Sequence, residues 1–359
     1  MSTSSPAARQ SRLELIDFLR GVAIIEMLAA HYADYLPPRI GHWVSDLETA
    51  MALFVVLAGF MVGYGYRKFA ARPGEESWVV WQRALRVVAI QYLLIVTIGI
   101  PSHLAGLPGY GNGQTLGVFV FQSLTFLNQI GLLHILPTFV PLFLVSPAIL
   151  WALARGWELP LLLVSAGVFC VGHLRPHLLD LGAPTIFPFV LFQFYFVCGS
   201  LLGKQCQLHG ELPPRAPGRW LMVSCALMLA TMLLVHAHYI PAHLIGTHPL
   251  NLLGLLYQAP ILATIWLGSR LLWPQIRGAW AVSLIERFGR HALLAFVIHV
   301  FLAKALGLLN YLASPPPWMN YLLIAISVLL INLALSAYER DRASENPRSW
   351  TRAMHVLFR

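Results

Sequence analysis

The sequence predicts an all-α integral membrane protein whose helices cross the bilayer many times. Hydrophobic residues make up 58% of its 359 residues and charged residues only 11%, whereas a soluble domain carries about 25% charged residues. Long apolar runs recur from Leu13 to Ala337, so most of the surface must meet lipid. We therefore expect one membrane domain at 13–337, between a cytoplasmic N-terminal tail at 1–12 and a cytoplasmic C-terminal tail at 338–359.

About ten spans follow one another along the chain, because a membrane-spanning helix needs about 20 mainly apolar residues. In order, we expect them at 15–34, 47–66, 83–100, 135–154, 159–174, 184–203, 219–238, 251–271, 291–311 and 318–337. The stretch 101–133 is different, because it opens with Pro101 and contains several glycines before a short apolar run. Whether this stretch crosses the membrane decides the side of every later loop.

Lysine and arginine residues indicate the orientation, because they accumulate in the cytoplasmic loops of membrane proteins. Arg20 and Lys304 lie within spans and are left out of the count. If 101–133 does not cross, 20 of the 24 basic residues lie inside and only Arg39 and Arg175 lie outside; if it crosses, 8 lie inside and 14 outside. We therefore expect both termini in the cytoplasm and a re-entrant or outside element near 101–133. Re-entrant backbone is tolerated only where protein or water covers it.

The composition also argues against several other kinds of protein. The net charge of +9 comes from basic clusters between apolar runs, which set membrane orientation, so we expect lipid and no nucleic acid as a partner. The four cysteines form no C-x-x-C pair, and the histidines of one outer loop have no acidic neighbour, so we expect no metal. The first apolar run is not a signal peptide, because it contains charged residues, namely Asp17, Arg20 and Glu26.

The first span carries a stripe of polar residues. Arg20 and His31 are eleven positions apart, which is three turns plus about 20° of rotation and about 16 Å of rise, so they share a helix face. Asp17 lies three residues before Arg20, and Asp34 lies three after His31, so each acid is a neighbour on that face. Charged side chains inside a span are costly, and by default they mark a functional site.

This stripe suits a reaction between groups that arrive from opposite sides of the membrane. Arg20, toward the cytoplasmic end, can hold a phosphate or carbonyl oxygen through its fork of donors. Neutral His31, toward the outer end, can take a proton from a hydroxyl group near pH 7. In the alternative interpretation, both side chains snorkel to the lipid headgroups. Glu26 lies off the stripe, and we expect it to pair with another helix.

The same residues carry a resemblance to a known family. Arg20, ten intervening residues and His31 match the Arg-x10-His motif of the family-3 membrane acyltransferases, and Leu53–Phe60 resembles the motif of that family's second helix. The chain is still more similar to the periplasmic-glucan succinyltransferase (OpgC-type) branch, in the segments 133–137, 192–203 and 288–299. Gly59, in the segment Leu53–Phe60, and Gly63, four residues later, form a small-xxx-small pair. Such a pair indicates close packing against another helix.

The resemblance implies a membrane O-acyltransferase of the bacterial inner membrane. Its donor would be cytoplasmic acyl-CoA, either succinyl-CoA or acetyl-CoA, and its acceptor a hydroxyl of a periplasmic glucan or another envelope polysaccharide. Acyl-CoA would be a substrate, so no permanently bound cofactor is expected. The expected catalytic residues are those of the stripe, namely His31, Arg20, Asp34 and Asp17.

Other residues are candidates for binding the two substrates. Basic side chains cluster at the inner ends of the second and third spans, where they can hold the phosphates of coenzyme A or anionic lipid; they are Arg67, Lys68, Arg83 and Arg86. The candidates for lining a cavity are His134, His299 and Lys304. Lys304 can neutralise an anionic acyl group, or snorkel to the outer headgroups.

Two questions stay open at the level of sequence. The acyl group can pass directly to the acceptor, or through a covalent acyl-His31 intermediate. The chain can also be a transporter or flippase, in which the stripe guides a solute or a lipid-linked sugar and no bond is made. Broken helices in two repeated halves would favour transport, and the sequence has no visible repeat of that kind.

Overall fold

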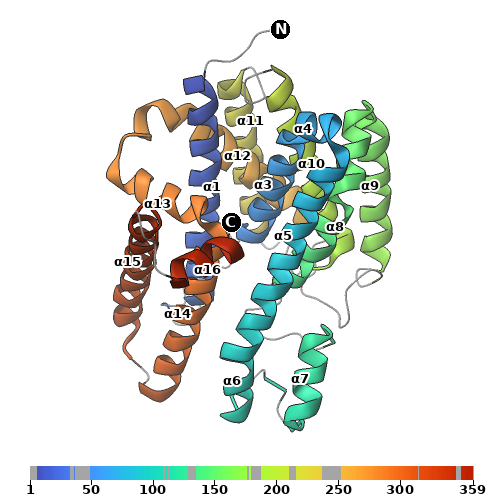
Figure 1. Ribbon diagram of the computed structural model, residues 1–359. Coiled ribbons are helices and arrows are strands. Elements are labelled where there is room, and N and C mark those ends of the chain that lie inside the picture. Colours follow the sequence, from blue (N-terminus) through green and yellow to red (C-terminus); the bar gives the residue numbers. More distant parts are fainter. Residues whose placement is uncertain are drawn as a thin grey trace. The chain divides into compact units, whose positions relative to one another are not determined.

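The protein is all-helical in the part of the chain that the computed structural model describes. That part comprises residues 6–32, 36, 49–107, 110–111, 113–127, 135–175, 178, 187–209, 216–236, 252–313, 315–344 and 349–358. The helices, in order, are α1 Pro6–Tyr32, α3 Ala50–Tyr64, α4 Tyr66–Ala71, α5 Pro73–Leu94, η2 Ile95–Gly99, α6 Ile100–Leu104, α7 Leu116–Leu124, α8 Ile135–Ala154, α9 Glu158–Leu174, α10 Phe189–His209, α11 Pro217–His236, α12 Leu252–Ile276, α13 Trp280–Arg290, α14 Ala292–Ala313, α15 Pro317–Arg342 and α16 Ser349–Phe358 (Figure 1). Helix α16 and the first turns of α1 fall in the ranges that were expected as tails.

Eight helices in the described residues are long and apolar enough to cross a membrane. They are Ala50–Ala71, Pro73–Leu104, Ile135–Ala154, Phe189–His209, Pro217–Val235, Leu252–Ile276, Ala292–Asn310 and Trp318–Arg342. Each coincides with one of the ten expected spans, and the prediction of an all-helical multi-pass membrane protein is confirmed. The other two expected spans fall on α1, a continuous helix of 27 residues that contains the polar stripe, and on α9, which has 17 residues.

The third expected span is longer than the sequence indicated. The helix runs through α5, η2 and α6 as one rod of 32 residues, Pro73–Leu104, or about 48 Å, against a hydrocarbon core of about 30 Å. The expected span at 83–100 is therefore too short at both ends. Pro101 lies in the first turn of α6, directly after the π-helical turn Ile95–Gly99. Proline is tolerated in the first turn of a helical segment, where its missing N–H is not needed for that segment's hydrogen bonds. The π-helical turn before it changes the backbone hydrogen-bond pattern from i→i−4 to i→i−5.

The remainder of 101–133 forms one short helix in its described residues. Helix α7 has nine residues, or about 13 Å, which is too short to cross the membrane. It packs beside α6, where the ring of His103 stacks on Phe119 with centroids 4.4 Å apart and Nδ1 of His103 lies 2.6 Å from the carbonyl oxygen of Tyr110. Burial raises the pKa of the Tyr110 hydroxyl to about 12. These residues therefore form a packed hairpin with the end of the long helix.

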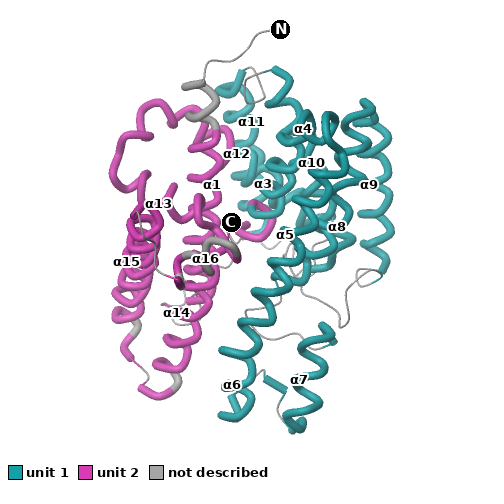
Figure 2. The backbone as a smooth tube through the Cα atoms, in the orientation of Figure 1, with its two compact units in different colours: residues 1–3, 54–264 teal, residues 4–53, 265–359 magenta. Residues whose placement is uncertain are grey.

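The chain divides into two compact units (Figure 2). Unit 1 comprises residues 1–3 and 54–264, and unit 2 comprises residues 4–53 and 265–359. Unit 2 is thus built from both ends of the sequence. It contains the whole described part of the polar stripe, whereas the basic candidates of α4 and α5 belong to unit 1.

In unit 1, helices α3 and α10 pack backbone against backbone. A Cβ atom added at Gly59 would overlap the carbonyl oxygen of Phe196, and one at Gly63 would overlap that of Ser200. The same overlap occurs in the other direction at two glycines of α10, Gly199 and Gly203. Small residues four positions apart allow helix backbones to approach this closely. The packing role predicted for Gly59 and Gly63 is therefore confirmed.

In unit 2, helix α13 lies against α1 through two further glycines. A Cβ atom at Gly21 would overlap the carbonyl oxygen of Ile285, and one at Gly289 would overlap that of Asp17. Phe288, beside the second contact, is fully buried. This packing brings the C-terminal end of α13 to the turn of α1 that carries Asp17 and Arg20.

Candidate functional site

Helix α1 positions an ion pair between Asp17 and Arg20. Nη2 of Arg20 donates a hydrogen bond to Oδ1 of Asp17, and the two side chains are 23% and 18% exposed. The second donor of the guanidinium, Nε, is buried and has no hydrogen-bond partner in the described part of the chain. A buried donor without a partner costs about 1–3 kcal/mol. Arg20 therefore keeps a donor that no described residue satisfies.

The other end of α1 brings His31 to a second histidine. Nδ1 of His31 lies 2.7 Å from Nε2 of His299, which belongs to α14 and is fully buried. The ring planes differ by only 6° while the centroids are 4.9 Å apart, so the rings meet edge to edge. On its other edge, Nδ1 of His299 lies 3.2 Å from the carbonyl oxygen of Phe296. The structure thus pairs two residues that were expected in different roles, His31 as a base and His299 as a cavity-lining residue.

Tyr32, the residue after His31, connects α1 to a third helix. Its hydroxyl lies 3.3 Å from Oγ of Ser327 on α15, and Tyr32 is 1% exposed. The C-terminal turn of α1 is therefore fixed by α14 and α15 together. The two hydrogen bonds restrict how far the His31 ring can move.

Glu26 pairs with another helix, as expected, by capping the start of α3. Its carboxylate accepts hydrogen bonds from the backbone N–H of Thr49 and from Oγ1 of Thr49, the latter at 3.0 Å. Thr49 directly precedes α3, which begins at Ala50. A carboxylate is favourable at a helix N-terminus, where backbone N–H groups lack helical partners. Glu26 therefore holds the N-terminal end of α3, and no ion pair among the described residues includes it.

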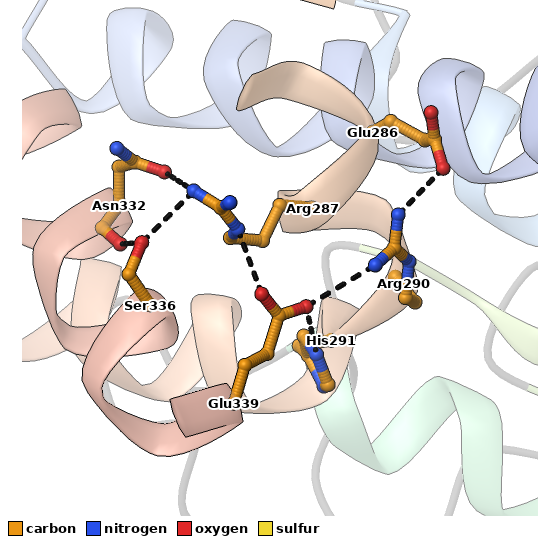
Figure 3. A network of polar contacts seen from close by, with 7 residues as sticks. All are labelled: Glu286, Arg287, Arg290, His291, Asn332, Ser336 and Glu339. Atoms are coloured by element: carbon orange, nitrogen blue, oxygen red, sulfur yellow. Dashed lines mark hydrogen bonds and ion pairs between the residues drawn. The ribbon is translucent and has the colours of Figure 1, made fainter. Parts of the chain in front are cut away.

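A polar network joins α13 to α15 around a single carboxylate (Figure 3). Glu339 accepts hydrogen bonds from Nε of Arg287 at 2.9 Å, from Nη1 of Arg290 at 3.3 Å and from Nε2 of His291 at 2.9 Å. Figure 3 also shows the second guanidinium contacts, from Arg290 to Glu286 at 2.7 Å and from Arg287 to two residues of α15, Asn332 and Ser336. The network fixes the C-terminal end of α13 on α15.

This network continues electrostatically to the polar stripe. Asp17 interacts with Arg290 and Glu286 in addition to its partner Arg20. Three carboxylates and three guanidinium groups are thereby gathered in unit 2, so the charges of the cluster balance; they are Asp17, Glu286, Glu339, Arg20, Arg287 and Arg290. The network thus holds Arg290 within electrostatic range of Asp17.

The sequence reasoning missed this network, although a signal for it was present. Asn332, Ser336 and Glu339 are spaced by four and three residues, which places them on one helix face. The last of them fell in the range expected as the C-terminal tail, whereas α15 continues to Arg342. The signal was this polar helix face, which continues beyond the C-terminal end of the apolar span.

The remaining candidates lie apart from the His31–His299 pair or outside the described residues. Lys304 is half-buried on α14, five positions after His299, which turns it about 140° around the helix to another face. Asp34 and His134 lie outside the described residues.

The basic candidates of unit 1 form two pairs. Arg67 and Lys68 are exposed on the short helix α4, and Nε of Arg67 donates to the hydroxyl of Tyr66 at 3.3 Å. Arg83 and Arg86 are half-buried on α5, three positions apart and therefore on neighbouring parts of one face. Exposed cations of this kind can meet either a phosphate ligand or lipid headgroups.

Metal binding has no support in the part of the chain that is described. No group of three or more His, Cys, Asp or Glu side chains there could hold a metal ion. Of the four histidines of the outer loop, three lie outside the described residues, namely His238, His243 and His248.

Comparison with known families agrees with these features of the chain. A family model described as "OpgC protein" matches residues 11–344, which include the polar stripe, His299 and the Glu339 network. A search of curated proteins finds no relative. The match confirms the resemblance to the OpgC-type branch, and the wider likeness to the family-3 acyltransferases is consistent with it. The family implies a transferase and suggests that its members modify glucans by acyl transfer. This multi-pass membrane protein belongs to the OpgC protein family.

Proposed function

We propose that this chain is an O-acyltransferase that moves a succinyl or acetyl group from cytoplasmic acyl-CoA to a hydroxyl of a periplasmic glucan. The family and the multi-pass architecture support a membrane transferase. The observation that carries the proposal is that α1 presents two polar groups. His31 is hydrogen-bonded to His299, and the buried Nε of Arg20 has no partner in the described residues. A base and a hydrogen-bond donor three turns apart on one helix suit a reaction between an acceptor and a donor that approach from opposite sides of the membrane.

The chemistry assigned to these residues is direct transfer. His31 removes the proton of the acceptor hydroxyl, and the resulting oxygen attacks the carbonyl carbon of the thioester. The new C–O bond forms, the C–S bond breaks, and the coenzyme A thiolate leaves and takes up a proton. General base catalysis of this kind contributes about 10²- to 10⁴-fold to a rate.

Arg20 is proposed to bind the acyl donor, about 16 Å from His31 along α1. Its Nε can donate to an oxygen atom of the donor, while Nη2 stays on Asp17. Asp17 thus orients the guanidinium and balances its charge. Asp34, next to His31 in the sequence pattern, remains a proposed neighbour of the base.

Further side chains are proposed to bind the acyl-CoA donor and the glycan acceptor. The phosphates of acyl-CoA are proposed to bind the basic side chains of unit 1, namely Arg67, Lys68, Arg83 and Arg86. Lys304 is proposed to neutralise the carboxylate of a succinyl group, and His134 to line the cavity for the acceptor. The positive-inside pattern supports a bacterial inner-membrane location with both termini in the cytoplasm.

Purified protein in detergent tests the proposal without the complication of membrane sidedness. The assay mixes acyl-labelled succinyl-CoA or acetyl-CoA with a glucan oligosaccharide and follows label on the glucan. We expect transfer by the wild type and a loss of at least about 100-fold in His31→Ala. His173→Ala is the matched control, because His173 is an exposed histidine of α9.

Other outcomes of the same assay separate the alternatives. Label that stays on the protein when the glucan is omitted would replace direct transfer by an acyl-enzyme route. Absence of labelled glucan with both donors and with several glucans, together with uptake of a sugar by proteoliposomes, would identify a transporter instead.

A further inference from the structure

The contact between His31 and His299 determines which ring nitrogen of His31 carries a hydrogen. A neutral imidazole has one N–H donor and one nitrogen with a lone pair, and the hydrogen bond at one nitrogen sets the state of the other. The chain of contacts runs from the Phe296 carbonyl oxygen through both nitrogens of His299 to Nδ1 of His31. Whether each nitrogen donates or accepts therefore determines the role of the next nitrogen.

The order of the hydrogens follows from the carbonyl group. The Phe296 oxygen can only accept, so Nδ1 of His299 is the donor in that 3.2 Å contact. Nε2 of His299 then holds a lone pair, and it must accept the 2.7 Å hydrogen bond from Nδ1 of His31. With its hydrogen on Nδ1, the His31 ring has its lone pair on Nε2.

The geometry of the two rings supports this assignment. Ring nitrogens donate and accept in the plane of the ring, and the two planes differ by only 6°. His299 is fully buried between neighbours on α14, so its orientation is fixed by packing. A neutral acceptor at this depth also orients His31 without adding a second buried charge, which would be costly.

We propose that His299 is a positioning residue that sets the tautomer of His31, so that Nε2 of His31 is the nitrogen that takes the proton. What Nε2 acts on rests on the proposed acyl transfer, whereas the tautomer of His31 does not. His299 touches no reacting atom in this scheme. It acts through the hydrogen bond to Nδ1 of His31.

Nitrogen-15 NMR of histidine-labelled protein in detergent micelles tests the tautomer directly. The ring nitrogens of His31 are assigned by the signals that disappear in His31→Gln. In the wild type we expect Nδ1 of His31 to carry the hydrogen and Nε2 the lone pair. In His299→Leu, which removes the acceptor, we expect a mixture of both tautomers; in His299→Gln, whose amide oxygen can replace Nε2, the wild-type pattern should return.

Steady-state kinetics of the same variants provide a second test of the role of His299. We expect kcat to fall about 10- to 100-fold in His299→Leu, which is part of the contribution of general base catalysis, with little change of KM for either substrate. His299→Gln should recover most of the loss, and His173→Leu, an exposed control on α9, should behave like the wild type. A purely structural role of His299 would lower the amount of folded protein and would not produce a shift of tautomer that the glutamine reverses.

Several results would overturn the inference. Hydrogen on Nε2 of His31 in the wild type would do so, as would an unchanged tautomer or an unchanged kcat in folded His299→Leu. If His299→Leu does not fold, the wild-type spectrum and the His299→Gln variant still decide whether His299 sets the tautomer of His31. If no variant transfers an acyl group, the proposed function fails, and the NMR result alone decides whether His299 sets the tautomer.

Discussion

At the scale of single residues, Arg20 differs from a basic residue that merely reaches for lipid headgroups. One part of its guanidinium is bound by Asp17, while Nε is buried with no partner in the described residues. A snorkelling side chain would place its polar atoms in water or at the headgroups. The observed arrangement therefore differs from snorkelling, and a role for Nε in binding the acyl donor is part of the proposed function.

Arg20→Lys tests this role, because lysine keeps the positive charge and removes the planar fork. We expect kcat/KM for the acyl donor to fall by about 10- to 100-fold, because a hydrogen bond that involves a charged group contributes about 1.5–3 kcal/mol. Initial rates of the purified variants at several donor concentrations measure it. Arg155→Lys is the control, because Arg155 is an exposed residue that stacks on Trp151, 4.0 Å from its ring centroid. Equal rates for wild type and Arg20→Lys would rule out a role for the fork.

At the scale of the helices, glycine contacts set the packing on which the site depends. Helices α3 and α10 touch through glycines in unit 1, and α1 and α13 do so in unit 2. Without a hydrophobic force between helices in lipid, such close packing and polar contacts supply the association. A larger side chain at these positions must separate the helices.

Gly63→Ala is expected to lower the stability of unit 1, because the added methyl group overlaps the carbonyl oxygen of Ser200. Overpacking of this kind costs about 1–3 kcal/mol, which should lower the Tm of the detergent-solubilised protein in a thermal scan. Gly167→Ala on α9 is the control, because nothing lies within 4 Å of its added methyl group. That control should leave Tm unchanged or raise it, since alanine is a better helix former by about 1 kcal/mol. Equal Tm values for the two variants would contradict the packing.

The sequence was sufficient for features that depend on local pattern. The apolar runs predicted the spans, and the spacing of Gly59 and Gly63 predicted a helix contact. The contact of His31 with His299 joins residues 268 positions apart, and no local pattern contains such information. The continuation of the helix through Pro101 was missed for a different reason, because a π-helical turn has no clear sequence signal.

At the scale of the whole molecule, orientation in the membrane decides which substrate meets which end of α1. The distribution of basic residues predicts that α4 lies in the cytoplasm and that the hairpin of α6 and α7 lies outside. Two exposed alanines mark these places, Ala70 at the end of α4 and Ala105 after α6.

Cysteines introduced at these alanines test the orientation in a background from which the four native cysteines have been removed. In intact spheroplasts, a membrane-impermeant maleimide should label Ala105→Cys and leave Ala70→Cys unlabelled. In inverted membrane vesicles the pattern should reverse. Labelling of Ala70→Cys from the outer side would invert the topology and, with it, the sides assigned to donor and acceptor.

The central claim is that this chain acylates a glycan through His31. Mass spectrometry of periplasmic glucans and surface polysaccharides tests it most directly, in cells without the gene and in cells complemented with wild type, His31→Ala or His173→Ala. We predict that one acyl mass disappears with the gene, and that wild type and His173→Ala restore it whereas His31→Ala does not. Unchanged acylation in every strain would contradict the claim.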